Sequence, residues 1–239
     1  MAIIKKQNMS AQIIDYILKQ IETDELKPGE KLLNERDLAE KLGISRVPLR
    51  EAVCALSALG ILTTRQGDGT FVNRFNEGML GRILYIYTIL DEISATDLME
   101  LRTLLEAGTA ASAAEKRSEE DLAMIREARD RFAGDYEQLR KARKGVRELL
   151  EADRKFHMAI GKAAGNKLYR EFLEAVRTPF SHVEFSDDLE VNLDNFRRSL
   201  RFHDRIVTAI EKQDKTEAYQ AMEEHIYDVS KSIQAGKKQ

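Results

Sequence analysis

The hydrophobic positions in the first third of the chain follow helical spacing and then strand spacing. Ile13, Ile17 and Ile21 recur every four residues, which predicts an amphipathic helix. Asn34 and Ser45 each precede a further helical stretch and are suitable N-cap residues. Two β-prone runs that flank a Gly and Asp turn then predict a hairpin. We expect helices over 9–21, 35–42 and 46–59 and strands over 61–65 and 70–72, which is the element order of a winged helix-turn-helix.

Beyond residue 81 strand patterns disappear and helical periodicity persists almost to the end. Residues 75–81 have no apolar periodicity and are expected to form a linker. The predicted fold is therefore mostly α, with a winged helix-turn-helix and its small β-hairpin over 1–74 and an all-helical bundle over 82–239. The expected helices of the bundle region span 80–90, 96–116, 119–141, 145–164, 167–182, 189–212 and 215–234.

Composition narrows the class of protein. The chain has 239 residues, of which 43% are hydrophobic and 33% charged, so two compact domains can each bury a core. The single Cys excludes an intrachain disulfide framework and a Cys-based zinc cage. No apolar run approaches the roughly 20 residues that a membrane span needs. The polar N-terminus lacks a signal-peptide core, so we expect a cytoplasmic protein with no membrane partner.

Two arginines give the third predicted helix a cationic face. Arg46 and Arg50 lie one turn apart, away from the apolar stripe of that helix, so both guanidinium groups can point outward. A recognition helix needs such fork-shaped donors near its N-terminus to reach base edges or phosphates. Arg36, early in the second helix, is placed to contact the DNA backbone. The alternative is that these arginines are only solvated, but the order of three helices and a hairpin favours DNA binding.

A second set of polar residues occupies inward positions of three later helices. Asp153 and His157 are four residues apart and can grip one ion from the same helix face. His203 and His225 each lie on the apolar stripe of a different helix. Burying an unpaired carboxylate is costly, and one divalent cation would satisfy all four groups. The set predicts a site for Zn²⁺ or Ni²⁺, with Mn²⁺ also possible.

A metal-free network of Asp–His hydrogen bonds is the alternative for these four residues. His182 fits no inward stripe, and we interpret it as unrelated to the site. Cys54, a lone thiol in the third helix, is interpreted as a packing or inert residue rather than a redox switch.

The N-terminal motifs resemble those of the GntR family of bacterial transcription repressors. The matching stretches are LKPGEKL at 26–32, ERDLA at 35–39, GISRVPLREA at 43–52, GIL at 60–62 and GDGTFV at 67–72. The resemblance covers about 9–74 and implies a DNA-binding head. The DNA contacts expected from it are Arg36, Ser45, Arg46, Val47 and Arg50, with Gln66 and Gly67 in the wing.

The rest of the chain resembles the FCD ligand-binding domain of the FadR subfamily. The stretches that carry this resemblance are Asp153-x-x-Phe156-His157-x-x-Ile160, Gly165-Asn166, His203-x-x-Ile206 and Leu101-Arg102-x-x-Leu105-Glu106. The resemblance implies an all-helical bundle with a central pocket, a homodimer, and a small organic-acid effector in the metal-containing members. It also implies that Arg102 meets the effector carboxylate, although a salt bridge to Glu106 is the alternative.

Together these features predict a metal-containing, ligand-responsive repressor that binds a pseudo-palindromic operator as a dimer and is not an enzyme. Residues 1–75 hold 11 Lys and Arg against 10 Asp and Glu, a net charge of +1, so the acidic balance belongs to the second domain. The alternatives are a metalloenzyme with an accessory DNA-binding domain and a regulator that senses the metal itself. No general base or nucleophile is identifiable beside the four ligands, which disfavours the enzyme.

Overall fold

The computed structural model describes residues 8–74, 78–143, 145–179 and 189–236. The chain divides into two compact units, Met1–Met79 and Leu80–Gln239. The fold is mostly α, with one two-stranded antiparallel sheet among the described residues, which confirms the predicted fold class. No helix in the described part of the chain is long and apolar enough to cross a membrane.

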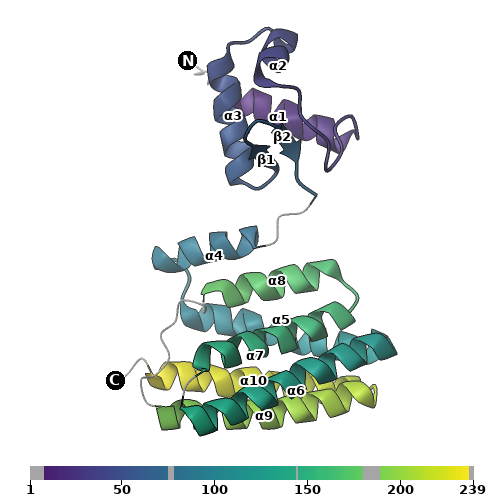
Figure 1. The fold of residues 1–239 in the computed structure, drawn as a ribbon, viewed down its shortest axis with the longest axis vertical. Coiled ribbons are helices and arrows are strands. Elements are labelled where there is room, and N and C mark those ends of the chain that lie inside the picture. Colours follow the sequence, from purple (N-terminus) through teal and green to yellow (C-terminus); the bar gives the residue numbers. More distant parts are fainter. Residues whose placement is uncertain (1–7, 75–77, 144, 180–188, 237–239) are drawn as a thin grey trace, which may run out of the picture. The chain divides into compact units, whose positions relative to one another are not determined.

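The first unit is a winged helix-turn-helix (Figure 1). Leu62 pairs with Val72 and Arg65 pairs with Gly69 in the hairpin, and Lys31 adds a single bridge to Phe71. Buried apolar residues from all three helices and both strands form one core. The elements of this unit are α1 (Met9–Glu22), α2 (Glu35–Leu42), α3 (Arg46–Ala58), β1 (Leu62–Arg65) and β2 (Gly69–Val72).

The ends of the helices in this unit follow from local chemistry. Asn34 caps α2 by accepting the backbone N–H of Asp37, and Gly43 ends that helix in the left-handed conformation. Ser45 occupies the N-cap position of α3 but forms no capping hydrogen bond, so that expectation is wrong in its detail. The reason is Pro48, which stands at the third helical position and has no N–H to donate.

The second unit is a bundle of helices. Four buried alanines on α5, at 107, 110, 113 and 114, let neighbouring helices approach closely. Capping boxes at Ser94 with Asp97 and at Ser118 with Asp121 fix the starts of α5 and α6. The helices are α4 (Met79–Ile89), α5 (Ala95–Lys116), α6 (Glu119–Ala142), α7 (Val146–Ala163), α8 (Lys167–Arg177), α9 (Leu189–Glu211) and α10 (Lys215–Gly236).

Two boundaries differ from the expected ones. Helix α4 begins at Met79, one residue before its expected start at 80, so it overlaps the range expected for the linker, and Gly81 there packs closely against Thr178. Helix α8 ends at Arg177 rather than at residue 182. Thr178 still has helical dihedral angles, but Pro179 after it has no N–H with which to continue the helical hydrogen bonds. Residues 180–182, and with them His182, lie outside the described part of the chain.

Candidate functional site

Three helices of the second unit bring the four predicted ligands together. Asp153 and His157 come from successive turns of α7, His203 comes from α9 and His225 from α10. All three imidazoles are buried, while Asp153 keeps a small exposed fraction. The Phe156 ring stacks on His203 with 4.0 Å between the centroids, which fixes that imidazole in the core.

The imidazole nitrogens of the site converge. The Nε2 atom of His225 lies 3.2 Å from that of His157 and 3.3 Å from that of His203. The Oδ1 atom of Asp153 lies 3.4 Å from Nε2 of His203 and 3.7 Å from Nε2 of His157. One donor atom from each of the four residues lies within 4.8 Å of every other. Ligand atoms about 2.1 Å from one ion lie roughly 3.0–3.4 Å apart, so these spacings suit a divalent cation.

A hydrogen-bond network alone leaves one of these close nitrogen contacts without a bridging proton. The Nδ1 atom of His157 faces the Oε2 atom of Glu106, and that contact requires a proton on Nδ1. A neutral His157 then directs an Nε2 lone pair at His225. His225 Nε2 can give its single proton to one neighbour only, yet it faces two ring nitrogens. A cation at the convergence point would be shared by all three lone pairs, so the residues present fit a metal.

The protonation of the cluster also suits metal binding. Burial lowers the pKa of His203. Burial, with the neighbouring imidazoles, lowers the pKa of His225 well below its ordinary value. Burial would raise the pKa of Asp153, but His157 and Arg177 hold it well below the usual range. The metal-free site at neutral pH therefore offers neutral His203 and His225 and an ionised carboxylate, which are the forms that bind a metal.

A buried charge network lies against the ligands. Arg177, the last residue of α8, donates to Asp153 Oδ2 at 2.5 Å and to Glu106 Oε1 at 3.2 Å. Arg102 donates its Nε–H to the same Glu106 oxygen at 2.5 Å. Burial would raise the pKa of Glu106, but Arg102, His157 and Arg177 hold it well below the usual range. The two arginines balance the two carboxylates, so a divalent cation would leave the centre with a net charge of about +2.

The outcome for the predicted site residues of this unit is mixed. The structure brings Asp153, His157, His203 and His225 together. Arg102 is buried and paired with Glu106, the partner that the sequence offered as the alternative to an effector. Arg177 was missed, because nothing in the pattern of α8 marks an end-of-helix arginine as directed inward. Glu106 was noted only as a partner of Arg102, although its four-residue spacing from Arg102 places both on one helix face.

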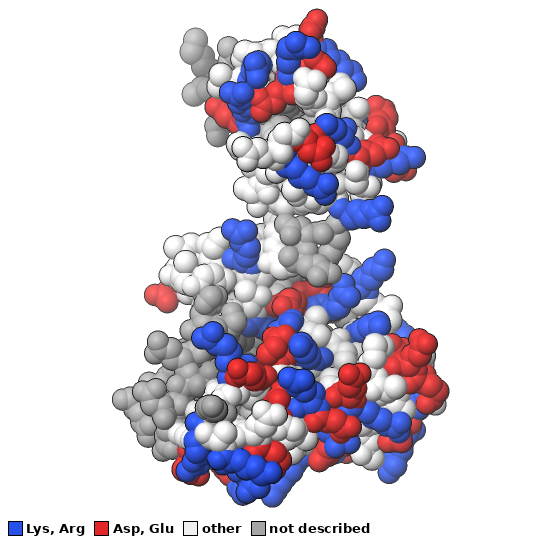
Figure 2. Space-filling model, in the orientation of Figure 1, with Lys and Arg blue, Asp and Glu red and all other residues white. Residues whose placement is uncertain are grey.

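The predicted DNA-contacting side chains of α2 and α3 lie on the surface of the first unit. Arg46 and Arg50 are more than half exposed and both face Glu35. Val47 is 66% exposed, which is unusual for a branched apolar residue. Arg36 is 80% exposed and pairs only with its neighbour Asp37 among the described residues. Figure 2 shows basic and acidic side chains interspersed over the face of the protein that it presents.

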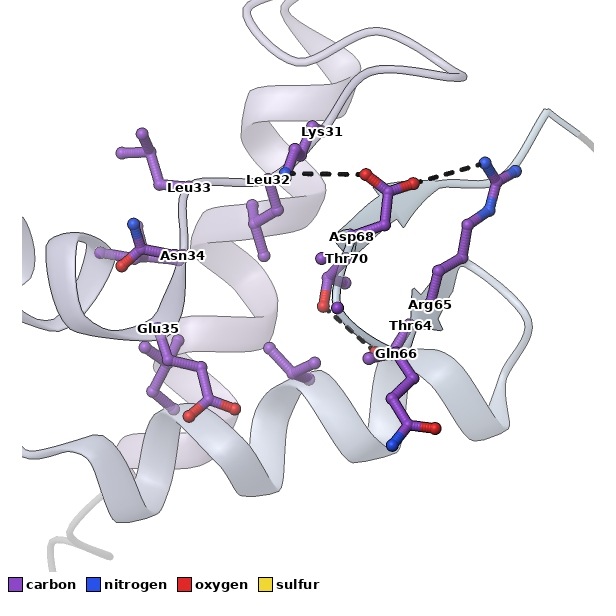
Figure 3. Close-up of a pocket in the computed structure, with 15 residues that line it drawn as sticks. Lys31, Leu32, Leu33, Asn34, Glu35, Thr64, Arg65, Gln66, Asp68 and Thr70 are labelled. Carbon is purple, nitrogen blue, oxygen red and sulfur yellow. Dashed lines mark hydrogen bonds and ion pairs between the residues drawn. The ribbon is translucent and has the colours of Figure 1, made fainter.

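A hollow of about 440 Å³ separates the wing from the first turns of α2 and the body of α3 (Figure 3). Gln66 and Gly67 lie at its wing side, and Gly67 has a positive φ of 77° that the tight turn requires. Asp68 lies 3.9 Å from both Arg65 and Lys31, and these two cations approach the Phe71 ring. The hollow is also lined by Leu32, Leu33, Asn34, Glu35, Leu38, Leu49, Val53, Thr64, Gly69 and Thr70.

Comparisons with known proteins match both units. The model of bacterial regulatory proteins of the gntR family matches residues 9–72, and the FCD domain model matches residues 97–228. The chain belongs to the GntR family of bacterial transcriptional regulators. It is a DNA-binding regulator whose FCD domain makes it ligand-responsive. The resemblance found in the sequence motifs is therefore confirmed.

Named relatives agree with this assignment. The regulator is 34% identical to the HTH-type transcriptional regulator LutR of Bacillus subtilis, over 87% of this chain and 94% of that protein. It is 27% identical to the putative L-lactate dehydrogenase operon regulatory protein of Escherichia coli, over 94% of this chain and 86% of the relative. A solved Streptococcus agalactiae GntR structure has 30% identity and a TM-score of 0.67, covering 93% of this chain and 99% of that one. These relatives are named as regulators of transcription, which favours a regulator over the metalloenzyme alternative.

Proposed function

We propose that this regulator is a metal-containing repressor of the FadR subfamily that responds to a small organic acid. The observation that carries the proposal is the convergence of three imidazole Nε2 atoms and one Asp153 oxygen beside a buried pair of arginines. Asp153, His157, His203 and His225 would hold the metal. Zn²⁺ and Ni²⁺ suit three imidazoles and one carboxylate best, and Mn²⁺ is the further option.

The charge at the centre supports an acid as the effector. A bound divalent cation would supply positive charge and coordination positions that four protein ligands leave open. Arg102 and Arg177 are held next to the four predicted ligands by Glu106 and Asp153, and both carry the fork-shaped donors that bind carboxylates. The name of the Escherichia coli relative refers to a lactate dehydrogenase operon, which agrees with a hydroxy acid. We therefore propose that a sugar acid or hydroxy acid binds at the metal with Arg102 at its carboxylate.

DNA recognition in this proposal rests on the exposed faces of α2, α3 and the wing. Arg46 and Arg50 would reach base edges, Val47 a thymine methyl, and Arg36 a phosphate. The Ser45 hydroxyl at the N-terminus of α3 makes no capping hydrogen bond and would donate to a phosphate. Gln66 and Gly67 would approach the minor groove from the wing. Because chromosomal DNA is its target, the regulator would act in the bacterial cytoplasm.

A homodimer would place two such heads on the half-sites of a pseudo-palindrome. Helix α4 and the start of α5 carry large apolar side chains that are exposed in the single chain, with Arg82 as the only charged residue of α4. A second copy of the chain would cover this apolar surface. We propose a division into a DNA-binding head over 1–74, a linker over 75–81 and an effector domain over 82–239. The exposed apolar residues are Ile83, Ile86, Tyr87, Ile89, Leu90, Leu101 and Leu104.

The test is a DNA-release assay with the full chain. The duplex that wild-type protein enriches from a random library is labelled, and fluorescence anisotropy follows binding. Sugar acids and hydroxy acids are added to protein loaded with Zn²⁺ and to protein stripped by a chelator. We expect one acid to release the duplex from the loaded protein only. Release by removal of Zn²⁺ without any acid would instead show a metal sensor. Tighter binding on addition of the acid would contradict an effector that lifts repression.

A further inference from the structure

One acidic side chain holds both arginines of the recognition helix. Glu35 is the first residue of α2, and its Oε2 atom accepts the Nε–H of Arg50 at 2.6 Å. The same oxygen lies 3.6 Å from a terminal nitrogen of Arg46. Figure 3 shows Glu35 beside the wing hollow, at the start of α2. Two arginines one helical turn apart on α3 are thereby tied to a single carboxylate from another helix.

The Arg50 nitrogen that Glu35 contacts determines which Arg50 donors remain available to DNA. A guanidinium group has five N–H donors, and the Nε–H is the one nearest the backbone. With Nε engaged by Glu35, the outer edge formed by the two terminal nitrogens stays free. That outer edge is the fork that pairs with O6 and N7 of a guanine. The contact therefore limits the directions in which Arg50 can point without occupying the donors that would contact a base.

A contribution to folding stability does not explain why the Glu35 carboxylate lies between these arginines. The side chains of Arg46 and Arg50 are 56% and 60% exposed and that of Glu35 is 35% exposed, and ion pairs so open to solvent contribute little to folding. A negative charge on a DNA-facing surface also lowers affinity for every duplex, whatever its sequence. Its presence between two arginines is therefore better explained by discrimination between sequences, which is a difference of affinities.

We propose that Glu35 is a positioning residue that sets the DNA specificity of this regulator by aiming Arg50 and Arg46. This role of Glu35 rests on the proposed contacts of Arg46 and Arg50 with DNA. The carboxylate pre-orders the two forks, which favours the operator, and repels phosphate when no base contact is made, which disfavours other sequences. In the wing, the Asp68 carboxylate lies 3.9 Å from the cations of Lys31 and Arg65. The 2.6 Å contact between Glu35 and Arg50 is shorter and restricts the guanidinium more strongly.

The experiment measures the affinity ratio between two duplexes. The full-length protein binds the duplex enriched by wild type from a random library and a scrambled duplex of the same composition, both followed by fluorescence anisotropy. We expect Glu35→Ala to bind the scrambled duplex more tightly and the enriched duplex more weakly, so that the ratio falls about ten-fold. Glu40→Ala is the matched control, since it removes the same charge from an exposed position of α2 that has no ion pair among the described residues. Its ratio should stay within about two-fold of wild type.

A double-mutant cycle separates positioning from a structural role. In an Arg50→Ala background, Glu35→Ala should change the ratio clearly less than it does in the wild-type background, because only the longer contact with Arg46 is left to be oriented. An equal loss of ratio with and without Arg50 would overturn the proposal. So would a Glu35→Ala protein that keeps the wild-type ratio while circular dichroism shows an unchanged fold.

The same series keeps the two proposals apart. If the Arg46→Ala/Arg50→Ala protein binds the enriched duplex as tightly as wild type, the proposed DNA contacts fail. If that protein loses the enriched duplex while Glu35→Ala keeps its ratio, the contacts stand and only the role of Glu35 fails.

Discussion

Arg177 on α8 donates a hydrogen bond to the Oδ2 atom of Asp153 on α7 at 2.5 Å. The opposite oxygen of that carboxylate faces the Nε2 atom of His203 at 3.4 Å. The arginine therefore orients the carboxylate and keeps it ionised, as supporting hydrogen bonds do for metal ligands in general.

Replacing this arginine should weaken metal binding without removing a ligand. We expect Arg177→Gln to lower the affinity for Zn²⁺ about 10- to 100-fold, because Asp153 loses its orienting partner. Competition with a chromophoric chelator measures the affinity. Arg154→Gln is the matched control, since Arg154 also joins α7 to α8, through Glu174 at 3.0 Å, but its ion pairs among the described residues are with Glu151 and Glu174 and not with the ligand set. Equal affinities for the two variants would contradict the role given to Arg177.

Removing an imidazole should abolish metal binding. We expect His203→Ala to retain no stoichiometric metal by elemental analysis after dialysis, while His182→Ala retains the wild-type amount. Metal at 100 times its dissociation constant should stabilise the wild-type fold by about 2.7 kcal/mol, and chelator should reverse the rise in Tm. A wild-type protein that binds no Zn²⁺, Ni²⁺ or Mn²⁺ would favour the metal-free hydrogen-bond network instead.

The metal-free protein should lose stability in mild acid. The pKa values of His203 and His225 are lowered by burial from 6.5, so below that pH the unfolded chain binds protons that the folded chain does not. Stability therefore rises with pH up to about 6.5 and falls progressively below it. Thermal melting of chelator-treated protein between about pH 5.5 and pH 7.5 should show a lower Tm at the acid end. His225→Gln removes one of the two groups and should flatten this dependence; an unchanged slope would contradict the assignment.

Arg102 should matter for the effector more than for the metal. Its guanidinium lies against Glu106 and contacts no ligand to the proposed metal, so Arg102→Gln should keep Zn²⁺ bound. The acid that releases DNA from wild type should bind this variant at least ten-fold more weakly, by loss of a charge-assisted hydrogen bond. Isothermal titration measures both quantities. Wild-type affinity for the acid would reduce Arg102 to a structural partner of Glu106.

The apolar surface of α4 and α5 should hold the dimer together. Leu104 is 66% exposed in the single chain, and Leu104→Glu would place a charge in the proposed interface. We expect this variant to run as a monomer in light scattering at concentrations where wild type is a dimer. Val191→Glu changes a partly exposed apolar residue of α9 and is the control. A dimeric Leu104→Glu protein would place the interface elsewhere.

Local patterns were enough for the elements and for much of the site. The four-residue spacing of Asp153 and His157 puts both on one face of α7, and the apolar stripes of α9 and α10 predict that His203 and His225 point inward. The missing cap of Ser45 was also within reach, because Pro48 three residues later has no N–H. Helical periodicity repeats over a few residues, so a single sequence carries it.

The sequence by itself therefore determined the winged helix-turn-helix, the helical bundle and the types of ligand, because each depends on neighbours one or two turns away. Tertiary structure alone decided which atoms meet. Arg177 reaches Glu106 across 71 positions of the chain, and Glu35 reaches Arg50 across 15. The direction of the three Nε2 atoms likewise depends on how α7, α9 and α10 pack. Such contacts follow from the relative placement of whole helices, which no periodicity within one helix encodes.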